Sequence, residues 1–178
     1  EFLQTRMVGL AEVRKNLEEW KPSMVEEYTA LITESEAVVP IDPERTDQLK
    51  AEAEALGKDF DLVPAKAIFS RKAGTGRHKC RGVACGNFMN AKSSESTFAS
   101  GASGIEVRTL IKLAAINQWE LSTLDVKTAF LNAPVAHDRG VVVVQPPRIF
   151  QEAGVLRDQK ELWLVKKALY GLVTSPRD

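Results

Sequence analysis

One aspartate stands out among the residues of this chain that could do chemistry. Asp125 is the only acidic residue within the segment 121–130, whose other members are apolar, hydroxylated or basic. A carboxylate inside an apolar strand is unfavourable unless a cation, a metal ion or several N–H donors offset its charge. At a strand end it could bind a divalent metal, beside a turn whose backbone N–H groups hold phosphate. Alternatively, it caps that turn by accepting a hydrogen bond from the N–H of Lys127 or Thr128.

A second feature is a basic stretch that contains no acidic residue. Residues 62–94 hold seven Lys or Arg and no Asp or Glu, whereas residues 1–61 hold seven basic and fifteen acidic residues. The net charge of the whole chain is zero. Such a block is a candidate footprint for phosphate groups, although a hairpin with basic residues on its solvated face would give the same pattern. Its members are Lys66, Arg71, Lys72, Arg77, Lys79, Arg81 and Lys92.

The other chemically capable residues define no site. The Gly74-Thr75-Gly76 sequence lacks both Walker and GxGxxG spacing, so we interpret it as the tip of a hairpin. Cys80 and Cys85 are five positions apart, which in a strand places their side chains on opposite faces and disfavours a disulfide or a shared metal ion. Two free thiols are typical of a reducing intracellular compartment, and they do not distinguish cytoplasm from nucleus.

The elements that must position these residues begin with helices. Leu10 to Trp20 shows apolar residues at helical spacing, and Pro22 is suited to the first turn of a second helix that extends to about Ile32. Asp42-Pro43 predicts the start of a third helix, which Gly57 should end. Glu1 is not a Met, which suggests that the chain is part of a longer polypeptide.

After Gly57 the pattern changes to strands. Segments 60–71 and 78–88 predict the two arms of a β-hairpin that carries the basic block. A Ser- and Gly-rich loop follows and ends in a Ser103-x-x-Glu106 capping box. The helix that this box begins should end near Asn117, with Val107, Leu110, Ile111, Leu113 and Ala114 mostly facing inward.

Three more strands are predicted, over 121–126, 141–144 and 161–165. The order of helices, hairpin, helix and strands indicates an α+β fold rather than regular βαβ winding. No apolar run approaches the ~20 residues that span a bilayer, and no signal-peptide pattern is present.

From about Phe60 to Arg177 the order of motifs resembles the reverse transcriptase domain of copia-type retrotransposons. The motif that resembles the family best is Leu124-Asp-Val-Lys-Thr-Ala-Phe-Leu-Asn132. The others are Lys79-Cys-Arg-Gly-Val-Ala-Cys-Gly-Asn-Phe88, Thr97-Phe98-Ala99, Glu106-Val-Arg-Thr-Leu110, Gln145-Pro146-Pro147, Ala168-Leu-Tyr-Gly-Leu172 and Ser175-Pro176-Arg177.

The resemblance implies a polymerase-like architecture of fingers and palm. Residues 1–58 would be a helical N-terminal segment that packs behind the fingers. Residues 59–104 would be the fingers-like hairpin and loop, and residues 105–178 the helix and the first part of the palm sheet. The family also has a Tyr-x-Asp-Asp hairpin later in the palm, which this sequence lacks. We therefore expect an incomplete domain that does not polymerise by itself.

The resemblance also assigns roles to residues. Asp125 would be the first catalytic carboxylate and a ligand of two Mg²⁺ ions in the full-length enzyme. Val126 would lend its carbonyl to a metal, Lys127 and Thr128 their N–H groups to the triphosphate, and Phe130 would exclude a ribose 2′-hydroxyl. Tyr170 and Gly171 match a strand that lines the nucleotide and template pocket. The residues that would grip the β- and γ-phosphates are Lys79 or Arg81, together with Arg71 or Lys72.

Three positions depart from the family pattern. Cys85 stands where the family usually has Arg, Ser100 where it has Pro, and Ala133 where it has Gly. We expect a fragment of an RNA-directed DNA polymerase from a retrotransposon polyprotein. Its partners would be RNA or DNA template-primer, deoxynucleoside triphosphates and the remaining palm and thumb. The alternative is a non-catalytic component, derived from such an element, that binds nucleic acid or joins a larger protein assembly.

Overall fold

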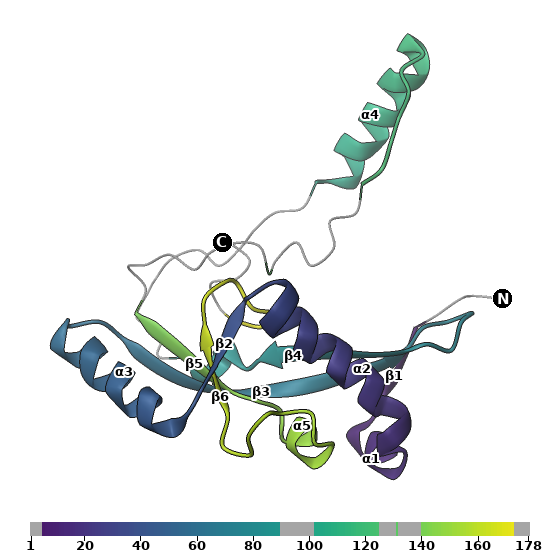
Figure 1. Ribbon diagram of the computed structural model, residues 1–178. Helices are drawn as coiled ribbons and strands as arrows, with labels where there is room; N and C mark the ends of the chain where they lie inside the picture. Colours follow the sequence, from purple (N-terminus) through teal and green to yellow (C-terminus); the bar gives the residue numbers. More distant parts are fainter. Residues whose placement is uncertain (1–4, 90–101, 125–130, 132–139, 173–178) are drawn as a thin grey trace.

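One long strand organises the fold. In this computed structural model, which describes residues 5–89, 102–124, 131 and 140–172, strand β3 (Phe60–Arg71) runs for twelve residues. Its first five residues pair in parallel with β5 (Val141–Gln145), and its last seven pair antiparallel with β4 (His78–Ala84). Strand β1 (Arg6–Val8) adds to the far end of β3 (Figure 1). A single strand therefore carries both the hairpin and the sheet behind it.

The rest of the sheet is antiparallel. Strand β6 (Leu162–Val165) pairs with β5 on one side and with β2 (Val38–Ile41) on the other. The path is β1-β3-β5-β6-β2, with β4 attached to β3. The predicted α+β fold class is confirmed, with a mixed sheet in place of regular βαβ winding. The strands predicted over 60–71, 141–144 and 161–165 are present to within a residue.

The N-terminal helices differ from prediction at Pro22. Helix α1 (Leu10–Lys15) ends at Asn16, and α2 (Leu17–Thr29) then runs through Pro22 into a π-helical turn, η1 (Ala30–Glu34). Trp20 and Met24 lie one turn apart and are both fully buried, so packing holds the helix together across the proline. The Ser23 hydroxyl donates to the Trp20 carbonyl at 2.7 Å, which satisfies one acceptor in the same turn.

Local signals predicted two other elements well. Helix α3 (Pro43–Ala55) begins where the Asp42 carboxylate accepts a hydrogen bond from Arg45 N at 2.6 Å, and Gly57 follows it with φ +63°. Helix α4 (Gly104–Asn117) begins with both bonds of the Ser103–Glu106 capping box. Strand β4 ends at Ala84, four residues earlier than predicted, where a short 3₁₀ turn, η2 (Gly86–Phe88), replaces it.

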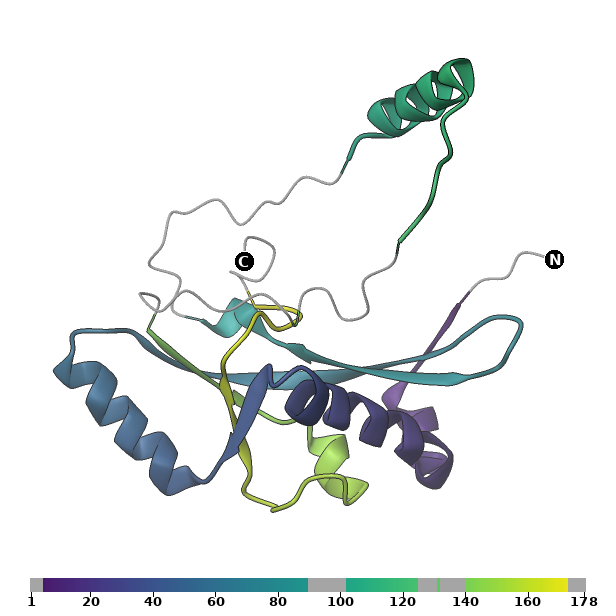
Figure 2. The same ribbon diagram turned by 45° about the horizontal axis from the view of Figure 1, so that its top comes forward.

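The surroundings of α4 differ from prediction. Of the five residues expected to face inward, only Ala114 is buried, and Leu110 and Ile111 are each about half exposed. No described element packs extensively on this helix, which stands apart from the sheet in Figures 1 and 2. Residues 121–124 of the predicted strand 121–126 are not in a strand, and no described strand pairs with them. Residues 125 and 126 lie outside the described part of the chain.

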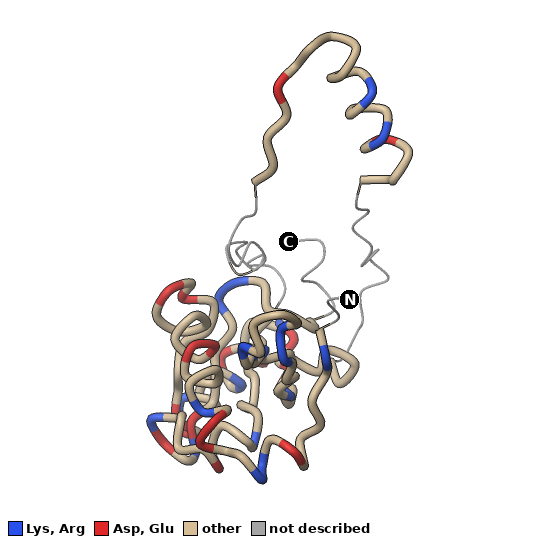
Figure 3. Tube along the Cα trace, turned by 90° about the vertical axis from the view of Figure 1, so that its right-hand side faces the viewer, with Lys and Arg blue, Asp and Glu red and all other residues tan. Residues whose placement is uncertain are grey.

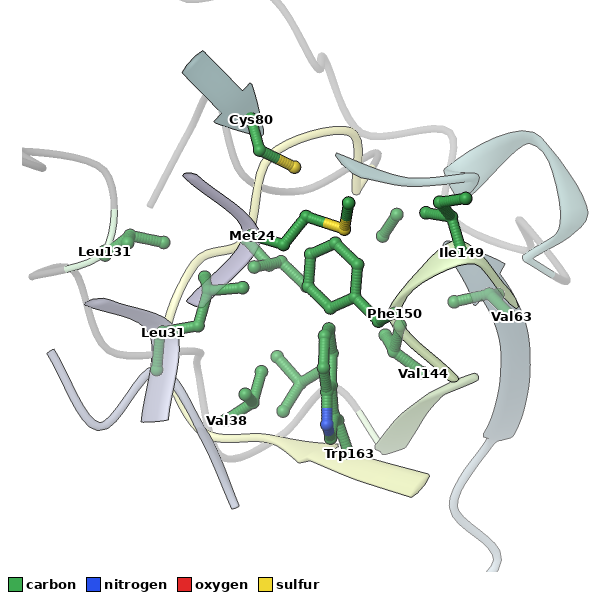
Figure 4. Packing of buried hydrophobic residues seen from close by; sticks show 14 of the residues in the cluster. Met24, Leu31, Val38, Val63, Cys80, Leu131, Val144, Ile149, Phe150 and Trp163 are labelled. Carbon is green, nitrogen blue, oxygen red and sulfur yellow. The ribbon is translucent and has the colours of Figure 1, made fainter. Parts of the chain in front are cut away.

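The hydrophobic core contains residues from the N-terminal and the C-terminal parts of the sequence. Met24 and Leu31 from the N-terminal helices meet Phe150 of helix α5 (Arg148–Glu152) and Trp163 of β6, all with almost no exposed surface (Figure 4). Burial of each such side chain contributes about 1.5–3 kcal/mol. The N-terminal segment is thus part of the same hydrophobic core as the hairpin and the sheet, and it supplies two strands, β1 and β2, that the sequence did not predict.

No helix among the described residues is long and apolar enough to cross a bilayer.

This shared core can be tested at two adjacent positions of α2. The substitution Met24→Ala should lower the free energy of unfolding by about 2–5 kcal/mol, because it leaves a cavity in the core. Val25→Ala removes a side chain that is 42% exposed and should change the free energy by less than about 1 kcal/mol. Urea denaturation followed by circular dichroism measures both. Equal effects at the two positions would contradict the packing of α2 against the sheet.

Candidate nucleic-acid interface

The β3–β4 hairpin separates its side chains onto two faces. Cys80, Gly82 and Ala84 are buried on the face that α2 covers, whereas Lys79 and Arg81, which alternate with them, are exposed. This alternation follows from the two-residue repeat of a strand. The hairpin therefore has a covered face, which packs on α2, and an outer face, which carries basic residues.

The outer face combines charge with apolar surface. Cross-strand partners lie on the same face, so the register of β3 and β4 defines its members. They are the pairs Lys66 and Val83, Ile68 and Arg81, and Ser70 and Lys79. The three basic side chains are exposed, and the other three residues are partly buried. Positive charges gathered on an exposed sheet attract anions, so this face is suited to phosphate groups.

Arg81 is oriented by an aromatic ring. Its guanidinium carbon lies 4.8 Å from the centroid of the Tyr170 ring. Such a cation–π contact contributes about 0.5–1 kcal/mol at an exposed site. It holds beside the ring a guanidinium whose N–H groups can donate to a phosphate. Two of the predicted site residues, Arg81 and Tyr170, are therefore in direct contact.

Backbone hydrogen bonds hold Tyr170 and Gly171 against the end of β4. Ala84 N donates to the Tyr170 carbonyl at 2.7 Å, and Gly86 N donates to the Gly171 carbonyl at 3.0 Å. Gly171 has φ +88°, and a side chain there would collide with the Ala84 carbonyl oxygen. A glycine is required at this position, which explains in physical terms the Tyr-Gly pair that the sequence motif contains.

Arg71 lies on the opposite, covered face. It pairs with His78 in the register, its guanidinium lies 5.8 Å from the Trp20 ring centroid, and one nitrogen is 3.9 Å from a Glu12 oxygen. His78 stacks on Trp20 at 4.1 Å. Lys72 is exposed in the turn that follows β3. Of the phosphate-binding candidates, the structure therefore brings Lys79 and Arg81 together and separates Arg71 from them.

Acidic residues of α2 line the hairpin on its other side. Glu26 forms an exposed ion pair with Arg77 at 2.6 Å, and Glu27 accepts a hydrogen bond from Gly82 N at 2.8 Å. Figure 3 shows acidic and basic residues interleaved in the part of the chain that holds the sheet. Sequence reasoning missed Glu27, although the acidic first third of the chain beside a basic block was a signal that the two would meet.

The residues with the most specific predicted roles lie outside the described part of the chain. These are Asp125, Val126, Lys127, Thr128 and Phe130. Leu131, the next residue of that motif, is described. It is 2% exposed and points into the core cluster (Figure 4). Leu124, on the other side, is 93% exposed. The described residues contain no group of three or more His, Cys, Asp or Glu that could hold a metal ion, so the predicted metal site stays a prediction.

A cavity of about 720 Å³ has a lining that includes none of the outer-face residues of the hairpin. It is formed by the start of α3 and the segment before β6, and its inner wall includes Glu161. The Glu161 carboxylate is buried and accepts hydrogen bonds from Tyr28 Oη, Trp163 Nε1 and Arg157 N. Burial, together with the hydrogen bond and the negative charge of Glu161, raises the pKa of Tyr28 to about 12. We interpret Glu161 as a structural carboxylate that joins α2 to β6.

The pH dependence of stability tests the environment of Glu27. Burial raises the pKa of this carboxyl, against the lowering effects of the Gly82 N–H bond and the charges of Arg81 and Lys79. Because the folded state binds this proton more tightly than the unfolded state, stability should fall as the pH rises from the ordinary range of a glutamate through the raised pKa. Glu27→Gln should lack this loss. Urea denaturation over a pH series measures it.

Glu26→Gln is the matched control, since it removes one exposed carboxylate from the same helix. A stability difference between Glu27→Gln and the unaltered chain that stayed constant with pH would contradict a partly buried Glu27 that titrates with a raised pKa.

Comparison with family models identifies a family for most of the chain. A family model described as reverse transcriptase (RNA-dependent DNA polymerase) matches residues 54–178. The match covers both strands of the hairpin, the outer face and the Tyr170–Gly171 segment, and it leaves out residues 1–53. No curated protein and no solved structure matches.

Proposed function

The chain belongs to the reverse transcriptase (RNA-dependent DNA polymerase) family, and on this premise we propose that it binds template and nucleotide for an RNA-directed DNA polymerase of a copia-type retrotransposon. The observation that carries the proposal is the outer face of the hairpin within the matched region, where Lys79 and Arg81 are both exposed and Arg81 contacts the Tyr170 ring. The copia assignment rests on the ordered motifs, above all the segment from Leu124 to Asn132.

The outer face is suited to a polyanion for three reasons. Lys66, Lys79 and Arg81 are exposed there, and α2 with its acidic residues covers the opposite face. Apolar residues between the charges, such as Ile68, offer surface to bases or sugars. The cation–π contact with Tyr170 also restricts the guanidinium of Arg81 in the absence of ligand, which lowers the entropic cost of binding phosphate.

Reverse transcriptases use divalent metal ions, which align the primer 3′-hydroxyl with the incoming triphosphate. In this chain we propose Asp125 as a metal ligand, with Val126, Lys127, Thr128 and Phe130 around the nucleotide as the resemblance implies. The described residues contain no cluster that could hold a metal ion. In this proposal the hairpin and Tyr170 bind and orient the template and the nucleotide.

Salt titration of nucleic-acid binding tests the outer face. We expect the chain to bind a fluorescein-labelled RNA–DNA template-primer with an affinity that falls steeply as salt rises, because bound Lys and Arg release counterions from phosphates. Lys79→Ala and Arg81→Ala should each weaken binding and reduce the slope of log affinity against log salt by about one. Fluorescence anisotropy measures both quantities.

The control is Lys50→Ala, which removes an exposed lysine of α3 away from the hairpin and should leave both affinity and slope nearly unchanged. A flat salt response of the unaltered chain, or equal effects of Lys50→Ala and Lys79→Ala, would count against an outer-face interface.

The catalytic assignment requires a polymerase-competent protein that carries this chain. There, Asp125→Asn should reduce primer extension on an RNA template by roughly two to three orders of magnitude while template-primer binding stays nearly intact. Asp158→Asn, in the loop before β6, is the control and should extend normally. Normal extension by Asp125→Asn would refute its catalytic role. Binding without any extension by the unaltered protein would favour a non-catalytic binding component instead.

A further inference from the structure

We propose that the N-terminal segment, which lies outside the family match, positions the Arg81–Tyr170 pair, with Glu27 holding one partner and the end of η1 the other. This inference rests on the proposed function, because the proposed function supplies the ligand that the pair would bind. Glu27 and Lys167 are positioning residues in this proposal. Neither needs to touch the template or the nucleotide.

On the Arg81 side, Glu27 fixes the outer edge of β4. Its carboxylate accepts from the N–H of Gly82, the residue next to Arg81, at 2.8 Å. This N–H points away from β3 and would otherwise be an unpaired donor at a sheet edge. The continuous helical unit of α2 and η1 also approaches closely, since a side-chain carbon added at Gly82 would lie 3.4 Å from Leu31 Cδ1 of η1. The helix therefore sets the position of the β4 backbone that carries Arg81.

On the Tyr170 side, the end of η1 binds the chain at Lys167, three residues before Tyr170. Lys167 Nζ donates to the Ser35 carbonyl at 2.6 Å, and the backbone N–H groups of Lys166 and Lys167 donate to the Ala37 carbonyl at 2.8 and 3.1 Å. Carbonyl groups at the end of a helix lack intrahelical donors, so a lysine there is well placed electrostatically. The segment that leads to Tyr170 is thus tied to the same helical unit that holds Gly82.

The two attachments meet at the stacked pair. Ala84 N donates to the Tyr170 carbonyl, so β4 and the Tyr170 segment are also joined to each other. The Arg81–Tyr170 contact then lies within a closed set of bonds that runs from Glu27 through β4 to Tyr170 and back through Lys167 to η1. Loss of either attachment should loosen the pair without removing either partner.

Charge and positioning predict opposite signs at Glu27. If the carboxylate acted only through its charge, its removal beside Lys79 and Arg81 would strengthen the binding of a polyanion. If it positions Arg81, its removal should weaken binding even though the chain becomes more positive. The sign of the change therefore separates the two explanations.

The experiment measures template-primer binding by the full 178-residue chain at one fixed salt concentration. Glu27→Ala should lower the affinity about fivefold, a loss equivalent to one net hydrogen bond. Glu27→Gln should bind at least as well as the unaltered chain, because the amide oxygen can still accept from Gly82. Glu26→Ala, the same substitution one residue earlier, should not lower affinity, since Glu26 forms an exposed ion pair with Arg77 and does not bond the β4 backbone at Gly82.

A second pair of variants tests the other attachment and does not depend on the folding of Glu27→Ala. Lys167→Met and Lys166→Met remove the same charge from adjacent residues, but only the Lys167 side chain bonds the Ser35 carbonyl. Lys167→Met should therefore lose more affinity than Lys166→Met. Hydrogen exchange at the Gly82 amide gives a direct structural reading, and it should be faster in Glu27→Ala and unchanged in Glu26→Ala.

Three results would each overturn this inference and leave the proposed function intact. They are higher affinity in Glu27→Ala, equal losses of affinity in the two lysine variants, and hydrogen exchange at Gly82 that does not respond to Glu27→Ala. Failure of the unaltered chain to bind template-primer would instead overturn the proposed function, and this inference with it.

Discussion

Strand β3 must satisfy two kinds of pairing along one continuous backbone. Its first part bonds in parallel with β5, and its second part bonds antiparallel with β4 and, at the far end, with β1. Any shift of register in one part would move the other, and a shift of one residue would exchange the two faces of the hairpin. The exposure of Lys79 and Arg81 on one face, and the burial of Cys80 on the other, therefore depend on how β3 is fixed in the sheet behind the hairpin. The core formed by Val63, Phe150 and Trp163 provides this constraint.

The free edge of β4 is covered by α2 and by the segment that holds Tyr170. A β-hairpin with basic residues on its arms has a free edge at β4, which invites pairing with another chain. At that edge, Glu27 of α2 accepts a hydrogen bond from Gly82 N, and the Tyr170 carbonyl accepts one from Ala84 N. Both partners come from segments distant in sequence, one before and one after the hairpin. The same contacts that protect the edge also direct the basic side chains to the outer face, so protection and function have a common structural origin.

The sequence predicted the elements that local chemistry determines. The Asp42 cap, the Ser103–Glu106 capping box and the Gly74–Gly76 turn each involve atoms a few residues apart, and their bonds are present. The break predicted at Pro22 was wrong because burial of Trp20 and Met24, which depends on distant partners, outweighs the local effect of a proline. Strands β1 and β2 were missed for a related reason: each is very short and is defined by its partner rather than by its own pattern. In the candidate site, the register separated Arg71 from Lys79 and Arg81, which no local rule could decide.

The charge pattern of the sequence has a physical meaning that net charge conceals. An acidic first third and a basic hairpin together sum to nearly zero, as two surfaces that neutralise each other would. In the structure, the acidic side chains approach the hairpin from one side. Glu12, Glu26 and Glu27 approach the hairpin from α1 and α2, and the positions they reach are Arg71, Arg77 and the backbone at Gly82. Lys66, Lys79 and Arg81 project from the other side of the strands. The acidic segment thus stabilises one face of the hairpin and leaves the positive charge of the other face available, which an even mixture of charges along the chain would not achieve.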